Sequence, residues 1–333
     1  MYGDQERQKQ ELTRRHLEDK SSYRDIQRRN HRSKNTAVKY LHEIAGNTKT
    51  SFWIAKNLKP KWGEVLCLDG TYIRVRNPFT DLARRENWYE DEKFLHKMTA
   101  FLGTDYHTRD MPHYSLGDNE NMIDLVLYFQ QLKANGYNLR ILVRDGNERM
   151  TTAAEKAYGR PIITQLCHRH FIDKMDEKIA SKDLIAEREQ MIRLQGIIWS
   201  IIRAKTIEEA VNRMNDFMKI RNQFLTSKNM KYLVSRFIRD FEQLTMYLQY
   251  PKRYIPTTVN VSENMNKQLK NRLKTMCSLQ SIRSAENYLN LWCLKRRFQK
   301  FTDCKKPHQH LNGKAPLEHA DCNISKLDYL NLS

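Results

Sequence analysis

The chain has 333 residues and a formal net charge of +19, with 58 Lys and Arg against 39 Asp and Glu. Its hydrophobic content of 40% and its 16 Tyr and 5 Trp argue against general disorder, and no apolar run reaches the length of a membrane span. The basic excess predicts a polyanionic partner, DNA or RNA, because Lys and Arg release the counterions condensed on phosphates, although a ribosome-associated or merely lysine-rich protein has the same composition.

The N-terminal region, residues 1–46, is strongly charged and short of Gly and Pro, and it is predicted to be helical. Two short helices separated by a basic turn are expected within it, with Ser33 as the N-cap of the second. This pattern favours a helix–turn–helix unit over an ordinary helical hairpin, which stays open as the alternative. The small core of the unit would consist of Tyr23, Ile26, Val38 and Leu41.

A helix–turn–helix unit would bind double-stranded DNA in two ways. Three arginines in or near the turn would contact phosphates, namely Arg28, Arg29 and Arg32. The second helix would enter the major groove with four polar side chains, namely Lys34, Asn35, Thr36 and Lys39.

Strands are predicted next. Residues 64–75 form a strand pair or one long strand through Gly70, and residues 98–105 and 111–116 form further strands. A helix capped by Asn119 and ended by Asn135-Gly136 follows them.

Two short apolar strands, at 139–145 and 161–166, complete this part of the chain. The order is strand–strand–strand–helix–strand, with an acid in the first strand and another closing the fourth. That order is the order of a ribonuclease-H-like core, a mixed-sheet α/β fold. Sites in open sheets collect at the ends of strands, where side chains converge.

The stretch from about residue 172 is almost purely helical and carries no catalytic-looking cluster, so it is predicted to be an inserted helical domain. A final helix is expected to begin near Ser262, which is its predicted N-cap. The chain therefore divides into four regions: a helix–turn–helix region at 1–57, the first part of the core at 58–171, the helical insertion at 172–256, and the second part of the core with a basic tail at 257–333.

Three carboxylates stand out as catalytic candidates. Asp69 and Asp145 each close an apolar strand directly before a glycine, where a buried acid is costly unless it is paired, hydrated or bound to metal. Two ordinary Asp-Gly turns are the alternative, because both residue types are common in turns. Glu263 lies in the first turn of the last helix, where an acid also compensates the helix dipole.

The helix of Glu263 has two distinct faces. Met265 and Leu269 lie on an apolar face that can pack on a sheet. The face of Glu263 also carries three lysines. This pattern fits a metal ligand next to side chains that bind the phosphates of a nucleic acid, and it also fits an ordinary amphipathic surface helix. These lysines are Lys267, Lys270 and Lys274.

Four blocks of sequence, in this order, resemble the blocks of a DDE transposase, most closely of the Mutator-like group of insertion-sequence transposases. They are LDGTYI at 68–73, VRDG at 143–146, CHRH at 167–170 and SENMNKQLK at 262–270. In that group a Cys-x-x-His element follows the second Asp and a helical insertion precedes the final Glu, and both features are present here. The segment LNGKAPLE at 311–318 is similar to the closing motif of the family.

The resemblance implies that Asp69, Asp145 and Glu263 are the catalytic acids and that they hold Mg²⁺ or Mn²⁺, as two ions. It implies cleavage at the DNA ends of a mobile element and strand transfer into target DNA. The implied partners are double-stranded DNA, as terminal repeats and target, and further copies of the chain on that DNA, with no membrane.

The implied location is the bacterial or archaeal cytoplasm, in association with the nucleoid. The six cysteines agree with it, because they form no CxxC pair and no regular framework, as expected of reduced thiols. No signal peptide is recognised at the N-terminus.

Two features leave alternatives open. His170 is expected either near the scissile phosphate, as a catalytic residue, or in packing together with Cys167, and these two residues are too few for a structural zinc site. The basic segment 295–297 suits contact with a nucleic-acid backbone, although its neighbours also fit a core. Irregular spacing argues against a zinc site in the tail, at Cys304, His308, His310 and Cys322.

Two other functions are compatible with the sequence. A domesticated DNA-binding protein would keep the fold and the charge without strand transfer, and the intact set of acids argues against it. A structure-selective nuclease with the same fold would hydrolyse DNA without ever joining it.

Overall fold

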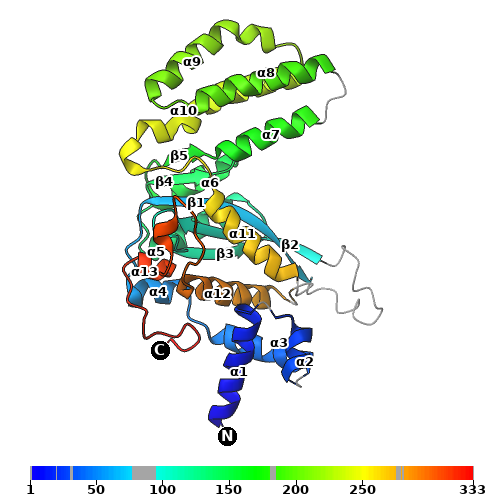
Figure 1. Ribbon diagram of the computed structural model, residues 1–333, viewed down its shortest axis with the longest axis vertical. Helices are drawn as coiled ribbons and strands as arrows, with labels where there is room; N and C mark the ends of the chain where they lie inside the picture. Colours follow the sequence, from blue (N-terminus) through cyan, green and yellow to red (C-terminus); the bar gives the residue numbers. More distant parts are fainter. Residues whose placement is uncertain are drawn as a thin grey trace.

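A five-stranded mixed sheet forms the centre of the molecule, which we describe from a computed structural model (Figure 1). The structure describes residues 2–19, 21–30, 33–76, 95–180, 185–274, 279 and 281–332. The strands are β1 (Val65–Arg76), β2 (Leu95–Asp105), β3 (His113–Gly117), β4 (Ile141–Arg144) and β5 (Ile163–Leu166), in the order β3-β2-β1-β4-β5.

The sheet combines two kinds of pairing. β1 pairs antiparallel with β2, and β2 with β3, whereas β1 pairs parallel with β4, and β4 with β5. Of the two predictions for residues 64–75, one long strand is correct, and Gly70 lies inside it. The further strands were also predicted, within a few residues of their bounds.

Helices cover both faces of the sheet because side chains alternate between the faces along each strand. On one face, Leu66, Leu68 and Leu142 pack against α5 (Met122–Ala134) and α6 (Glu148–Tyr158). On the other face, Ile73 and Val75 pack with α11 (Asn260–Leu273) and α12 (Ile282–Phe298).

Two predicted helix caps are wrong. The N-cap of α5 is Asn121, whose side chain accepts a hydrogen bond from the backbone N–H of Asp124, and not Asn119. The last helix begins at Asn260 without a side-chain cap, so Ser262 lies inside it. The hydroxyl of Ser262 instead donates to the carbonyl oxygen of Cys67 at 2.6 Å, which ties α11 to β1.

A helical region, here called the helical insertion, lies at one end of the molecule (Figure 1), and its first helix begins at His168, before the expected start at about residue 172. It comprises α7 (His168–Ala180), α8 (Ile185–Ile202), α9 (Ile207–Ile220), the 3-10 helix η3 (Arg221–Phe224) and α10 (Lys228–Gln249). Ile198, Ile201 and Phe217 are among the buried residues of its own hydrophobic core. A second 3-10 helix, η4 (Pro251–Arg253), follows before α11.

The N-terminal helices lie at the opposite end of the molecule (Figure 1). They are α1 (Tyr2–Leu17), α2 (Tyr23–Asn30), α3 (Lys34–Asn47) and α4 (Ser51–Leu58). Ser33 caps α3 as predicted, by accepting a hydrogen bond from the backbone of Thr36. Tyr23, Ile26 and Leu41 are buried between these helices.

The C-terminal part adds η6 (Gln309–Leu311) and α13 (Pro316–His319). In the part of the chain that the structure describes, no helix combines the length and the apolar character needed to cross a membrane.

Candidate active site

Asp69 and Asp145 lie at corresponding positions of two neighbouring parallel strands. In the register of β1 and β4, each of them directly follows the last pair of opposed residues. Alternation along the strands gives Asp69 the face of Cys67 and Asp145 the face of Val143, and these two apolar residues share one buried cluster. Both carboxylates therefore belong to the sheet face that α11 covers.

Two hydrogen bonds hold α11 against β1 on either side of Glu263. Ser262 donates to the carbonyl oxygen of Cys67, and the Asn266 side-chain amide donates to Asp69 Oδ2 at 2.7 Å. Glu263 lies between these two anchors in the first turn of α11. Its position is therefore fixed to the strand that carries Asp69.

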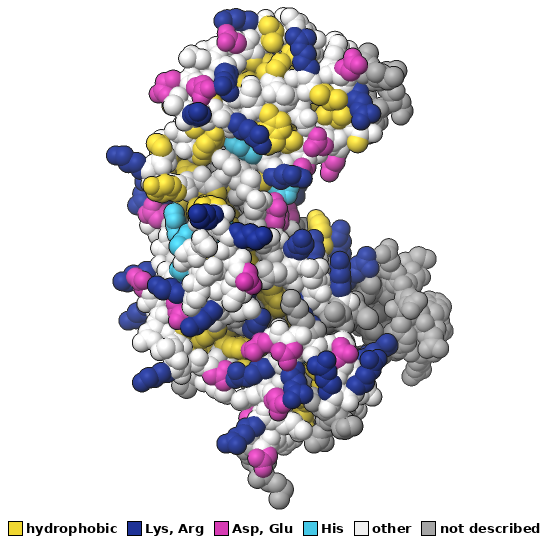
Figure 2. Space-filling view, in the orientation of Figure 1, with side chains coloured by type: hydrophobic (Ala, Val, Ile, Leu, Met, Phe, Trp, Pro, Cys, Tyr) yellow, Lys and Arg dark blue, Asp and Glu magenta, His cyan; other side chains and the backbone are white. Residues whose placement is uncertain are grey.

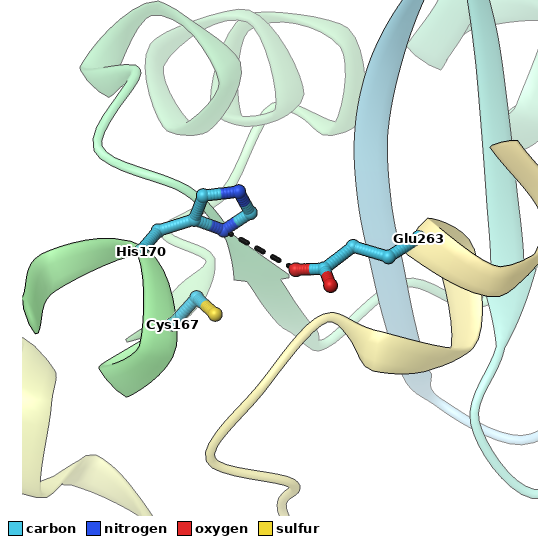
Figure 3. Close-up of side chains that lie close together, drawn as sticks. All are labelled: Cys167, His170 and Glu263. Atoms are coloured by element: carbon cyan, nitrogen blue, oxygen red, sulfur yellow. Dashed lines mark ion pairs between the residues drawn. The ribbon is translucent and has the colours of Figure 1, made fainter. Parts of the chain in front are cut away.

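Cys167 and His170, at the end of β5 and the start of α7, approach Glu263 (Figure 3). His170 Nδ1 lies 3.5 Å from Glu263 Oε1, and one ligand atom from each of the three residues lies within 4.8 Å of the others. Both His170 Nδ1 and Glu263 Oε1 are buried and have no hydrogen-bond partner among the described residues. Buried polar atoms are normally satisfied, so these two atoms indicate a place for a bound ion or ligand.

The donor types divide this centre into two parts. Cys167 and His170 offer sulfur and nitrogen, which suit zinc better than magnesium. Asp69, Asp145 and Glu263 offer carboxylate oxygens alone, the ligands that Mg²⁺ prefers. Glu263 belongs to both parts.

The pKa shifts show that the charged groups of this centre act on one another. The pKa of Asp69 is raised to about 6, and burial is the main cause. The charges of Asp145 and Glu263 also raise this pKa, whereas the hydrogen bond from Asn266 and the charge of His170 lower it. The neighbouring Cys167 side chain is the largest cause that raises the pKa of His170 to about 9, and the charges of Glu263 and Asp69 act in the same direction. At neutral pH His170 therefore carries a positive charge beside the acids.

Gly70 and Gly146 directly follow the two aspartates. Charged side chains from other segments lie very close to the backbone of each glycine. A Cβ atom on Gly70 would lie 2.2 Å from Glu120 Oε1. A Cβ atom on Gly146 would lie 2.9 Å from Lys174 Nζ and 3.1 Å from Arg236 Nη2. Neither glycine is in the left-handed region, so close approach, and not turn geometry, explains why a glycine suits these positions.

Glu120 is a fourth carboxylate of the site, and the sequence reasoning missed it. Its Oε2 accepts a hydrogen bond from the Asn147 side chain at 2.8 Å, and the Asn147 backbone N–H donates to Asp145 Oδ1 at 2.9 Å. Burial is the main cause that raises the pKa of Glu120. In the sequence, Glu120 stands in a polar stretch before a helix and looks like an ordinary loop residue.

A cavity of about 900 Å³ opens beside Glu263, between the helical insertion and the start of α11. Glu263 and His170 line it on the side of the sheet, and Trp199, Arg203 and Tyr247 line it on the side of the insertion. Figure 2 shows a hollow between the upper, helical part of the molecule and the body below it. A ligand can therefore reach Glu263 from the direction of the insertion.

The predicted DNA-binding residues fall into two separate groups. The first group lies on α2 and α3, at the end of the molecule away from the insertion (Figure 1). In this group Arg28, Arg29, Lys34, Asn35 and Lys39 are exposed, Thr36 is partly exposed, and Arg32 lies outside the described residues. The second group, Lys267, Lys270 and Lys274, is exposed along α11 or at its end, and it follows Glu263 in sequence.

The other basic and metal-binding candidates are not part of this centre. Arg297 is fully buried, and its guanidinium donates to both oxygens of Asp110, at 2.8 and 2.7 Å, so it is not available to a nucleic acid. Within the described residues the tail contributes no group of three metal-ligating side chains.

The comparisons with known proteins agree with the geometry of the site. A family model described as "Transposase, Mutator family" matches residues 97–296, more than half of the chain. The matched range contains Asp145, His170 and Glu263 and begins after Asp69. Comparison with curated proteins gave no match.

Proposed function

Because the chain belongs to the Mutator family of transposases, we propose that it cuts DNA at the ends of a mobile element and joins the freed strands to target DNA, with Asp69, Asp145 and Glu263 as its catalytic acids. The observation that supports this proposal is that carboxylates from β1, β4 and α11 belong to one face of the sheet, near enough for the charges of Asp145 and Glu263 to raise the pKa of Asp69. The proposed fold of this centre is ribonuclease-H-like, which the strand order β3-β2-β1-β4-β5 supports.

The proposed cofactor is Mg²⁺ or Mn²⁺, as two ions held by Asp69, Asp145 and Glu263. The donor set fits, because it consists of carboxylate oxygens, and Glu263 Oε1 is buried without a hydrogen-bond partner among the described residues. When bound, two such ions supply the positive charge that activates an attacking hydroxyl and stabilises the leaving oxygen of an in-line displacement. The raised pKa of Asp69 has the same implication, since a nearby cation relieves the cost of ionising a buried acid.

Two successive displacements at phosphorus make up the proposed reaction. In the first, the oxygen of water bonds to phosphorus, the bond to the 3′ oxygen breaks, and that oxygen leaves as a 3′-hydroxyl after taking a proton. In the second, this 3′-hydroxyl bonds to a phosphorus of the target, and the target strand loses its own 3′ oxygen from that phosphorus. The second step needs no external energy source, because one phosphodiester bond forms as another one breaks.

His170 and Asn266 assist the acids in this proposal. Protonated His170 stands 3.5 Å from Glu263, in a position to donate a hydrogen bond to a phosphate oxygen bound at the acids. Asn266 fixes the Asp69 carboxylate through its side-chain amide. In this proposal the chain itself orients the Asp69 carboxylate through Asn266 and supplies one positive charge through His170.

DNA binding is proposed at two places. α2 and α3 would form a helix–turn–helix that reads the element ends, supported by their exposed basic residues and by the capped start of α3. The exposed lysines of α11 would follow the backbone of the strand that is cut. Further copies of the chain on the same DNA would bring two element ends together.

The test uses a duplex that carries the inverted repeats flanking the gene, together with a target plasmid and Mg²⁺ or Mn²⁺. Asp69→Asn, Asp145→Asn and Glu263→Gln should each lower cleavage at least 1,000-fold, on the order of what electrostatic catalysis contributes, while DNA affinity changes less than about threefold. Glu148→Gln, a carboxylate that is 67% exposed on α6, is the matched control and should cleave normally.

Product analysis separates this proposal from its rivals. Target-joined strands are expected from the unaltered chain. Cleaved but never joined ends would identify a nuclease, and DNA binding without any cleavage would identify a domesticated DNA-binding protein. A loss of DNA binding in all three acid variants would assign the acids a structural role.

A further inference from the structure

Two cations from the helical insertion converge on the backbone of Gly146, directly after Asp145. A Cβ atom placed on Gly146 would lie 2.9 Å from Lys174 Nζ and 3.1 Å from Arg236 Nη2. Lys174 comes from α7 and Arg236 from α10. The two positive charges are therefore close neighbours, although their helices come from the insertion and not from the layers that cover the sheet.

Each cation has a carboxylate neighbour away from Gly146. For Lys174, no ion pair is found among the described residues, and its charge lowers the pKa of Glu120, against the larger effect of burial. Arg236 approaches Asp240 only through Nε, at 3.5 Å, while its guanidinium lies over the ring of Phe171. The Nη2 end of Arg236 is left to face Gly146.

Two cations this close repel each other, and both side chains are partly withdrawn from water, so a further anion bound between them is favoured. Arg236 is 11% exposed, and its packing on Phe171 fixes its direction. Lys174 lies one helical turn after His170 on α7, so the two side chains share a face of that helix. That face presents His170 to Glu263 and Lys174 to the residue that follows Asp145.

We infer that Lys174 and Arg236 form a binding site for a phosphodiester group of the DNA strand, next to the phosphate that is cut. The inference rests on the proposed function, because that function supplies the strand. A phosphate bridges two cations well, since its oxygens accept hydrogen bonds from an ammonium and a guanidinium together. The helical insertion then has a direct role, since it holds the strand against the acids from the side opposite α11.

The first experiment measures how tightly the full chain binds a 20-base-pair duplex, with Ca²⁺ in place of Mg²⁺, over a series of salt concentrations. Lys174→Met should weaken binding about fivefold to tenfold and lower the salt slope by about 1, the value for one lost phosphate contact. Lys174→Arg should restore both quantities. Lys178→Met, one turn further along α7, is the matched control and should change affinity less than twofold.

Arg236→Met should have the same effect as Lys174→Met, with Arg239→Met on the same helix as its control. Arg239 is 62% exposed and contacts Glu148 and Asp240 instead. If Arg236→Met fails to fold because Asp240 loses a partner, the lysine variants still decide the question.

The inference is overturned if Lys174→Met leaves affinity and salt slope unchanged and alters only the binding of Mn²⁺, measured by titration calorimetry. Lys174 would then serve to neutralise Glu120. This outcome is distinct from a failure of the proposed function, in which the unaltered chain does not cleave DNA whatever residue stands at position 174.

Discussion

At the scale of single residues, charged side chains lie very close to the backbone of the two glycines that follow Asp69 and Asp145. Gly70 and Gly146 leave space that Glu120, Lys174 and Arg236 fill, so a glycine after each aspartate controls which charges surround it. The pKa of Asp69 is raised chiefly by burial, and the charges of Asp145 and Glu263 act in the same direction.

Asp69→Asn should make the metal-free protein more stable at neutral pH. The folded-state pKa of Asp69, about 6, is higher than the ordinary value of 3.8 for an aspartate, so ionisation opposes folding. This cost is absent below about pH 4, grows as the pH rises to 6, and is then constant at no more than about 3 kcal/mol. Urea unfolding in EDTA from pH 4 to pH 8 measures it, with the variant and the unaltered chain converging at the acidic end.

Divalent metal provides the control for that measurement. Mn²⁺ should stabilise the unaltered chain above pH 6 and have much less effect on the variant, because the variant lacks one ligand. A variant that is less stable than the unaltered chain at pH 7 in EDTA would contradict the expected sign.

At the scale of elements, α11 combines several tasks in 14 residues. Met265 and Leu269 pack on the sheet, Ser262 and Asn266 anchor the helix to β1, and Glu263 joins the acids. Its exposed lysines continue along the outer side. The N-terminal helices α2 and α3 form a second basic element, whose exposed side chains lie away from the acids.

Replacing Lys34 and Lys39 together with Ala should weaken binding to DNA that carries the element ends about tenfold or more. It should also lower the salt slope by up to about 2, because two cations lose contact with DNA. Lys219→Ala, 74% exposed on α9, is the matched control. Anisotropy titrations at several salt concentrations measure both quantities, and a slope equal to that of the unaltered chain would count against the helix–turn–helix.

At the scale of the whole molecule, contacts between distant segments hold the fold together. Arg297 in α12 binds Asp110 near β3 in an ion pair whose two side chains are fully buried, and Trp62 donates to the same carboxylate at 2.7 Å. Near the N-terminal helices, Arg272 of α11 donates a hydrogen bond to His16 Nδ1 of α1 at 2.6 Å. Burial and the charge of Arg272 lower the pKa of His16 to about 3, so this histidine is neutral in the folded protein.

Arg297→Met should lower the free energy of unfolding by about 3–5 kcal/mol, because it leaves the Asp110 carboxylate buried without its counter-ion. The double variant Arg297→Met with Asp110→Asn should lose clearly less, since neither charge is then buried alone. Urea unfolding of the three proteins gives the comparison. Equal losses in the single and double variants would mean that packing of the arginine stem, and not its charge, accounts for the effect.

The helices α4 and α6 were not predicted from the sequence, which by itself determined the order of the strands and the helical insertion. These features follow from short-range patterns, such as the apolar strand before Asp145 or the helical spacing of Ile198 and Ile201, which need no knowledge of distant residues. The proposal of Asp69, Asp145 and Glu263 as a group came from motif resemblance. Even so, two caps were misplaced, because a polar side chain such as Ser262 can serve a distant carbonyl instead of its own helix.

Only the tertiary structure decided which charges surround those acids. Glu120, Lys174 and Arg236 stand in ordinary polar stretches and carry no local signal, and they meet Gly70 and Gly146 because α5, α7 and α10 pack where they do. Burial of Arg297 and the exposure of the α11 lysines were equally undetermined by sequence, since a basic residue on an amphipathic helix suits a solvated face or a buried pair. Electrostatic free energy depends on distance and burial, and both are set by packing between segments far apart in the chain.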